Sequence, residues 1–460
     1  MPLVVYNAVM RRLFLIFVLL LVACGPAKPV SQFTVLTHPD GPLYVGDQVS
    51  FEVLAPAGFA PGDHQAQVNF QGRTIGEAGF QPFGIGGRVE AVLYWVWDTH
   101  GLGIAAYPLT FSILPDGPTW TETIALHPAS QVPPPEPAAH WTSTQTTCCT
   151  IYYITGTDAG RDIDRLGQIA DEQSAEVAAQ FHTHLDTPIP VTFLPRVLGH
   201  SGFTSDGVYV SYLDGNYMDS DLGILLHHEF VHYYDGTLGG QFRPSILQEG
   251  LAVYLSGGHF KPEPIGPRAA ALLALGWYIP LRTLADDFYQ QQHETGYLEA
   301  AGLVKYLVET YGWEAFNSFY RDIPSPAGSR PSDDMDSSLR QHLGVSFSEV
   351  EAGYQAYLKS QAVPEAVRTD LQLSVRFYDT ADAYQQRFDP SAFFMNAWLP
   401  AGTTMRNHHI VADMLRHPSH WENRLLEGLL ERAQRELSSG DYPATVRTLN
   451  GLDWILNLVP

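Results

Sequence analysis

His227-His228-Glu229-Phe230-Val231-His232 lies near the middle of a chain of 460 residues. Apolar residues precede this segment and an Asp-Gly pair follows it, so we expect a helix over about residues 221–235. On that helix His228 and His232 are four residues apart, and their side chains project from one face, one turn apart. Two imidazoles in this arrangement can reach one Zn²⁺ ion at about 2.0–2.1 Å each, and Glu229 beside the first is a candidate general base.

A catalytic zinc ion needs more than two protein ligands, so a third is expected further along the chain. Seventeen residues after His232 the chain has Gln248-Glu249-Gly250-Leu251-Ala252, inside a predicted helix over residues 245–256. Together the two segments resemble the paired motifs of the gluzincins, the thermolysin-like and aminopeptidase-N-like zinc metallopeptidases. The resemblance implies that Glu249 is the third ligand of a single zinc ion, with an open position for water. It also implies an α+β zincin-like peptidase domain, which we place at residues 142–362.

A third segment, Tyr297-Leu298-Glu299-Ala300-Ala301-Gly302, begins a predicted helix over residues 296–311. It is similar to an aminopeptidase-N segment whose first tyrosine hydrogen-bonds the developing oxyanion, which implies a catalytic role for Tyr297. The alternative is a buried tyrosine that anchors the helix. The chain has no G-x-M-E-N-type segment before the metal-binding helix, the segment with which aminopeptidases hold a free amine. We therefore expect an endopeptidase rather than an aminopeptidase.

Other polar residues near these motifs have ordinary explanations. His227 points about 100° away from the ligand face and is expected to be a surface or outer-shell group. His200 and His259 have no ligand spacing and are expected to be solvated. Asp235 could orient a ligand histidine through a carboxylate–imidazole hydrogen bond, or it could simply belong to the end of the helix.

The N-terminus has the pattern of a secretory signal. Arg11 and Arg12 precede an apolar run over residues 13–23, which is too short to span a bilayer comfortably. The run ends in Leu21-Val22-Ala23-Cys24, which resembles the bacterial lipobox and implies a signal peptide over residues 1–23 and lipidation of Cys24. The alternative is an uncleaved membrane anchor with an incidental cysteine. In either case we expect the remainder of the chain outside the cytoplasm, held at the cell membrane.

Apart from Cys24, the only cysteines are the adjacent pair Cys148 and Cys149. Neighbouring cysteines can form a strained vicinal disulfide, and two buried or reduced thiols are the other possibility. Neither case provides a disulfide framework, so the stability of the fold must come from packing.

Composition limits the class of protein and its partners. The apolar fraction is 45% and the charged fraction is 16%, values of a globular rather than a disordered chain. The net charge is −23, and loss of residues 1–23, with their two arginines and no acid, would make it −25. This charge and the lack of a basic stripe argue against nucleic acid as a partner. We expect a monomer.

Residues 32–128 predict an all-β sandwich of the immunoglobulin type. Apolar and polar residues alternate in several short runs, as at Val49, Phe51 and Val53, and turn signals separate the runs. A Pro-rich linker is expected over residues 129–141. We expect this first domain to be a passive spacer rather than a substrate-binding module.

Residues 363–460 predict a mainly helical region. The segment from Trp421 to Leu437 is expected to be a helix, and the hairpin that follows resembles a single tetratricopeptide-like unit. One such unit cannot bury its own apolar face, so a hairpin that caps the peptidase domain is preferred.

The whole pattern predicts a lipid-anchored, extracytoplasmic zinc metallopeptidase that acts on a polypeptide substrate. In this prediction His228, His232 and Glu249 bind the metal, Glu229 is the general base and Tyr297 stabilises the oxyanion. Two alternatives remain open. One is a catalytically silent, peptidase-like scaffold at the cell envelope, and the other is a zinc hydrolase that acts on a different bond.

Overall fold

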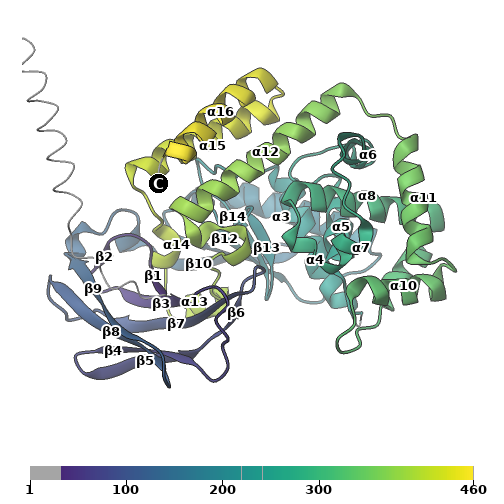
Figure 1. Ribbon diagram of the computed structural model, residues 1–460. Coiled ribbons are helices and arrows are strands. Elements are labelled where there is room, and N and C mark those ends of the chain that lie inside the picture. The colour runs from purple at the N-terminus through teal and green to yellow at the C-terminus, as the bar shows by residue number, and fades with distance from the viewer. Residues whose placement is uncertain (1–32, 219, 241, 459–460) are drawn as a thin grey trace, which may run out of the picture.

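The computed structural model describes residues 33–218, 220–240 and 242–458 (Figure 1). A β-rich domain comes first along the chain, a mixed α and β domain second, and a mainly helical region last. The predicted β-rich beginning and helical end are confirmed, while the immunoglobulin and zincin topologies stay predictions. The expected signal peptide and Cys24 lie outside the described residues.

Two β-sheets form the first domain, with strand orders β1-β3-β7-β6 and β2-β9-β8-β4-β5. The strands are β1 (Thr34–His38), β2 (Leu43–Tyr44), β3 (Gln48–Leu54), β4 (Gln65–Phe70), β5 (Arg73–Gly79), β6 (Gln81–Phe83), β7 (Arg88–Asp98), β8 (Ala106–Leu114) and β9 (Thr119–His127). Phe51, Trp97 and Phe111 are almost wholly buried in the core of this domain. The rings of Phe51 and Phe111 meet edge to face at 5.3 Å. The alternating apolar residues of the sequence therefore form the inner faces of the sheets.

A five-stranded sheet is the framework of the second domain, in the order β10-β11-β12-β14-β13. Its strands are β10 (Trp141–Gln145), β11 (Cys149–Ile154), β12 (Ile189–Leu194), β13 (Gly202–Thr204) and β14 (Val208–Ser211). The central strands β11, β12 and β14 run parallel, and β10 and β13 are antiparallel strands at the edges. β12 and β14 are buried over nearly their whole length, as is typical of parallel strands covered on both faces.

Helices pack around this sheet, and two of them, α4 and α5, contain the predicted metal ligands. They are α2 (Asp158–Arg161), α3 (Ile163–Gln180), α4 (Leu222–Leu238), α5 (Ser245–Ser256), α6 (Ile265–Leu275), α7 (Leu281–Asp286), η3 (Phe288–Gln290), α8 (His293–Tyr311), α9 (Trp313–Arg321), α10 (Pro331–His342) and α11 (Phe347–Ser360). α4 packs against α3 and contacts β13 and β14, and α5 packs against both α4 and α8. None of the described helices is both long and apolar enough to cross a membrane.

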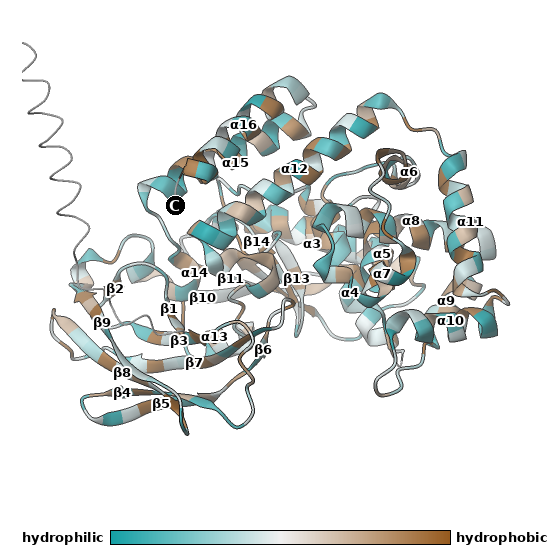
Figure 2. Cartoon of the chain, in the orientation of Figure 1, coloured by the Kyte–Doolittle hydropathy of each residue, from teal (hydrophilic) through white to brown (hydrophobic). Residues whose placement is uncertain are grey.

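The last region is helical, as predicted. Its elements are α12 (Glu365–Phe388), η4 (Pro390–Ala392), η5 (Phe394–Asn396), α13 (Gly402–Asn407), α14 (Ala412–Leu415), α15 (Trp421–Ser438) and α16 (Tyr442–Leu458). Hydrophilic and hydrophobic residues are interleaved along α12, α15 and α16 (Figure 2), as in amphipathic helices. These helices share one apolar core with Tyr217 and Met218 of the second domain. The α15–α16 hairpin therefore packs on its neighbours, as the preferred interpretation has it.

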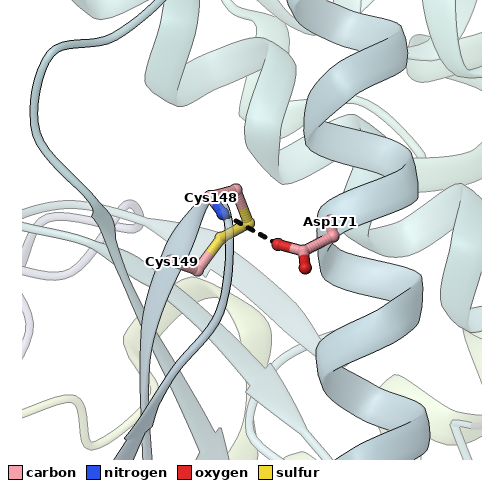
Figure 3. A group of neighbouring side chains, drawn as sticks. All are labelled: Cys148, Cys149 and Asp171. Atoms are coloured by element: carbon pink, nitrogen blue, oxygen red, sulfur yellow. Dashed lines mark hydrogen bonds between the residues drawn. A yellow bond between two sulfur atoms is a disulfide. The ribbon is translucent and has the colours of Figure 1, made fainter.

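Cys148 and Cys149 form a vicinal disulfide at the turn between β10 and β11 (Figure 3). The carboxylate of Asp171, on α3, accepts the backbone N–H of Cys148 at 2.8 Å and that of Thr147 at 3.2 Å. Burial raises the pKa of Asp171, but these and neighbouring donors outweigh it, so the pKa is lowered. Asp171 thus holds the turn against α3. Of the two possibilities left open for Cys148 and Cys149, a disulfide or two thiols, the structure has the disulfide.

Two buried arginines join the β-rich domain to the rest of the chain. Arg416 has a side chain only 5% exposed and donates to both carboxylate oxygens of Asp47, at 2.6 and 2.8 Å. It also donates to Glu136, in η2 (Glu136–Ala138) of the predicted linker, at 2.7 Å. Arg196 is 1% exposed and reaches Asp40 at 3.2 Å. The β-rich domain is therefore docked through buried ion pairs as well as connected by the linker.

We predict that Arg416→Ala lowers the free energy of unfolding by about 3–5 kcal/mol, because it leaves two buried carboxylates without their partner. The matched control is Arg340→Ala, since the Arg340 side chain is 61% exposed and its ion pair with Asp336 lies at the surface. That control should cost less than about 1 kcal/mol. Denaturant unfolding of both variants measures the difference, and equal losses would contradict a structural role for Arg416.

Glu299, on α8, has a carboxyl group buried in the protein core. Its side chain is wholly buried, and one oxygen accepts the backbone N–H of Ile279 at 3.3 Å. Burial is the main cause that raises the pKa of Glu299 well above its usual 4.5, and the charge of Glu351 adds to it. The folded chain therefore keeps a proton that the unfolded chain releases above about pH 4.5.

We predict that this buried carboxyl makes the folded chain less stable as the pH rises above 4.5. Glu299→Gln should remove that part of the pH dependence and raise the melting temperature more at pH 8 than at pH 5. Thermal unfolding at the two pH values is the measurement, with the exposed Glu314→Gln as control. The same change in melting temperature at both pH values would show that Glu299 is ionised in the fold.

Candidate metal centre

His228 and His232 project from one face of α4 toward a single point, as predicted. Their Nε2 atoms lie 2.9 Å apart, and the two rings meet at 79°. Asp221 is the N-cap residue of α4, and its carboxylate accepts the backbone N–H of Ile224 in the first turn of the helix. The helix thereby presents two imidazole nitrogens to the same space.

Glu249 completes the group from α5. Its Oε2 lies 3.1 Å from Nε2 of His232 and 3.4 Å from Nε2 of His228. The three side chains are between 8% and 10% exposed. Ligand atoms around a tetrahedral ion with bonds of about 2.0–2.1 Å lie about 3.3 Å apart, close to the separations found here. His228, His232 and Glu249 therefore form a buried group that can hold a metal ion.

Close packing of α5 on α8 fixes the position of Glu249. A Cβ atom at Gly250 would lie 2.5 Å from the backbone carbonyl oxygen of Ala300, which is closer than real Cβ atoms approach. Glycine is needed at this position because any side chain would push the helices apart. The glycine after Glu249 thus has a packing role that the motif alone does not reveal.

The charges of His232 and Glu249 stabilise each other. Burial, the largest single effect, lowers the pKa of His232, but the charge and hydrogen bond of Glu249 outweigh it and raise the pKa to about 9. Burial likewise raises the pKa of Glu249, but the two histidines outweigh it and the pKa is lowered. The carboxylate is therefore ionised, which is the state that a metal ligand requires.

Glu229 lies beside the group and is itself 4% exposed. Its Oε2 accepts a hydrogen bond from the hydroxyl of Thr204, on β13, at 2.8 Å. A Cβ atom at Gly202 would lie 2.8 Å from Oε1 of Glu229, so the edge strand leaves room for this carboxylate because residue 202 is glycine. Burial raises the pKa of Glu229, which makes it a stronger base than a solvated carboxylate.

Two tyrosines approach Glu249. Tyr289, on η3, donates its hydroxyl hydrogen bond to Oε1 of Glu249 at 2.7 Å. The ring of Tyr297, on α8, lies 6.3 Å from that of His228 and 4.4 Å from that of His259. Tyr297 is therefore both buried and near the metal-capable group, and its catalytic role stays a prediction. Sequence reasoning missed Tyr289, because no motif marks the short η3 turn.

The expectation that His200 and His259 are solvated was wrong. Both are buried, and with His293 they line the same cavity as the metal-capable group. Nδ1 of His259 lies 2.7 Å from Oε2 of Glu294, and Nδ1 of His200 lies 2.8 Å from Nε2 of His293. Burial lowers the pKa of His259 to about 4, so this imidazole is neutral at pH 7. These rings come from separate segments, so ligand spacing gave no signal for them.

His227 and Asp235 face away from the metal-capable group. His227 is buried, not at the surface, and its ring nitrogens lie 2.8 and 2.9 Å from the side-chain oxygens of Gln173 and Gln180 on α3. The carboxylate of Asp235 accepts the hydroxyl of Tyr320 at 2.8 Å. Asp235 thus ties the end of α4 to α9, and within the described residues it makes no hydrogen bond to a ligand histidine.

A cavity of about 660 Å³ opens onto the metal-capable group. Glu229, Tyr289 and Tyr297 line it, and one wall is formed by β13 and the residues after it. Among the described strands, β13 is paired only with β14, so no described strand occupies its other edge. The arrangement can therefore hold a metal ion, a buried base and an extended ligand in one space.

A scan against models of protein families and a search of the curated proteins each found no match to this chain. The resemblance to gluzincins therefore depends on the motifs themselves.

We predict that Tyr289→Phe weakens metal binding by about 10–100-fold, because removing an outer-shell partner of a metal ligand has effects of that size. Glu249→Ala should weaken it further, since a ligand itself is lost. The matched control is Tyr254→Phe, on the same helix as Glu249 but not among the cavity-lining residues. Competition with a chromophoric chelator at pH 7 measures the affinities. An unchanged affinity in Tyr289→Phe would exclude a supporting role for this hydroxyl.

Proposed function

We propose that this chain is a zinc-dependent endopeptidase of the gluzincin type. The observation that carries the proposal is the convergence of His228, His232 and Glu249 beside the buried carboxylate of Glu229. Two imidazoles and one carboxylate are the ligand set of catalytic zinc sites, which keep a fourth position open. A buried carboxylate beside these ligand residues, with a raised pKa, is the additional group that hydrolysis needs.

His228, His232 and Glu249 would hold the zinc ion, which when bound would supply Lewis-acid polarisation of the substrate carbonyl and activation of water. Glu229 takes the proton of the attacking water and then passes it to the leaving amine. Burial raises the pKa of Tyr297 well above its usual value, so its hydroxyl stays protonated and can donate to the developing oxyanion. Thr204 orients the base through its hydrogen bond to Oε2 of Glu229.

The edge of β13 that no described strand occupies supports a polypeptide as the substrate. An extended peptide can add to an exposed strand edge through main-chain hydrogen bonds. β13 lines the cavity that contains Glu229, and Thr204 of this strand touches the base directly. A substrate strand on this edge would therefore run past the reacting groups, which favours cleavage within a chain over cleavage at its end.

The location of the protein is a further part of the proposal. The lipobox-like segment ending in Cys24 supports a lipid anchor on the outer side of the cell membrane. Fractionation of cells that make the full chain or its Cys24→Ser variant tests the anchor, because loss of the lipid should release the protein from the membrane.

We predict that the detergent-solubilised chain contains about one zinc ion and cleaves internal bonds of a peptide library. Glu229→Gln should keep the zinc and lower kcat/KM by about 10²–10⁴-fold, the usual contribution of a general base. Glu314→Gln, an exposed change on α9, is the matched control. Mass spectrometry of the digests, with zinc quantified in each sample, gives both readouts.

The outcomes separate the alternatives. Zinc without any cleavage would favour the silent scaffold or a different scissile bond, and a chain that binds no zinc would contradict the proposal. Full activity in Glu229→Gln would show that the base is assigned to the wrong residue.

A further inference from the structure

The β-rich domain reaches the cavity through the turn between β6 and β7. This turn, Gly84-Ile85-Gly86-Gly87, extends from the domain toward β13 (Figure 1). Ile85 lines the cavity that contains the metal-capable group, and it is 45% exposed. A large apolar side chain at the cavity wall thus keeps nearly half of its surface exposed.

The turn is seated on η5 by close backbone contacts. The N–H of Gly86 donates to the carbonyl oxygen of Met395 at 2.7 Å. A Cβ atom at Gly84 would lie 2.5 Å from the same oxygen, and one at Gly86 would lie 2.9 Å from Oδ1 of Asn396. Gly84 also has a φ of +64°, a conformation that glycine adopts without strain. The glycines on either side of Ile85 therefore let the turn dock at this place.

η5 continues the contact to the metal-capable group. Phe394, its first residue, lines the cavity and stacks on His200 with a centroid distance of 4.8 Å and an interplanar angle of 4°. The ring of Phe394 also lies 6.3 Å from that of Tyr289, whose hydroxyl binds Glu249. A chain of contacts therefore runs from the turn through η5 to a candidate metal ligand.

We infer that the β-rich domain is part of the substrate-binding cleft and that Ile85, beside Phe394, forms a subsite for an apolar side chain of the polypeptide. The inference rests on the proposed function for the nature of the substrate. An apolar substrate residue packed on Ile85 would remove both side chains from water, which favours binding. The domain thus has a role in recognition, in place of the passive spacer expected from the sequence.

The test uses the full-length, detergent-solubilised chain and blocked hexapeptides of Ala and Gly in which one Leu or one Asp occupies each position in turn. Ile85→Asp should lower kcat/KM for the best Leu peptides by about 10-fold, mainly through KM, because apolar pockets discriminate by factors of this order. Activity on the Asp peptides should not fall. The conservative variant Ile85→Leu should keep the wild-type preference for the Leu peptides.

The matched control is Ile104→Asp. Ile104 is 67% exposed in the same domain and is not among the residues that line the cavity, so its substitution should leave the profile unchanged. Circular dichroism and zinc content of each variant exclude unfolding as the cause. A wild-type peptide profile in Ile85→Asp would overturn the inference.

A binding measurement separates this inference from the proposed function. Anisotropy of labelled Leu and Asp peptides on the Glu229→Gln chain, with and without Ile85→Asp, reports the subsite without turnover. If the wild type cleaves nothing but the Leu preference is present and disappears with Ile85→Asp, the endopeptidase proposal fails and the subsite stands. If binding shows no Leu preference, or if Ile85→Asp does not alter it, the subsite fails whatever the activity.

Discussion

Glu249 carries a buried negative charge between two imidazoles, and much of the surrounding structure holds these three side chains in place. A carboxylate in this position is costly unless charged or hydrogen-bonding partners accompany it. His228 and His232 approach one of its oxygens, and Tyr289 donates to the other. The contact of Gly250 with α8 keeps α5 close enough for this arrangement. The candidate site is therefore as much a product of helix packing as of its ligand residues.

The parts that could be predicted from sequence are those specified by neighbouring residues. The helix expected over residues 221–235 is α4, Leu222–Leu238, and the helix expected over residues 245–256 is α5, Ser245–Ser256. Apolar periodicity and flanking turn residues define both. Two of the three candidate ligands are four residues apart on one helix, so their meeting follows from helix geometry. Alternating apolar residues likewise predicted the β-rich domain.

The parts that could not be predicted depend on contacts between distant segments. His200, His259 and Tyr289 line the same cavity, yet no short spacing links them in the sequence. Ile85 stands in a glycine-rich turn that looks like an ordinary hairpin connection until η5 is placed beside it. The docking of the first domain depends on Arg416 and Arg196, whose partners only the tertiary structure identifies. Local pattern gives no signal for such pairings.

The pairing of Arg416 with Asp47 also has a consequence for how the chain is made. The two residues are 369 positions apart. At about 5–20 residues per second, roughly 20–70 s pass between the synthesis of the two partners. For most of that interval the first domain can form its own sheets while η5, which receives the turn that bears Ile85, has not yet been made. A nascent chain that has not reached η5 therefore has no docking site for this turn, and the cavity takes its final form only after η5 and Arg416 have been made.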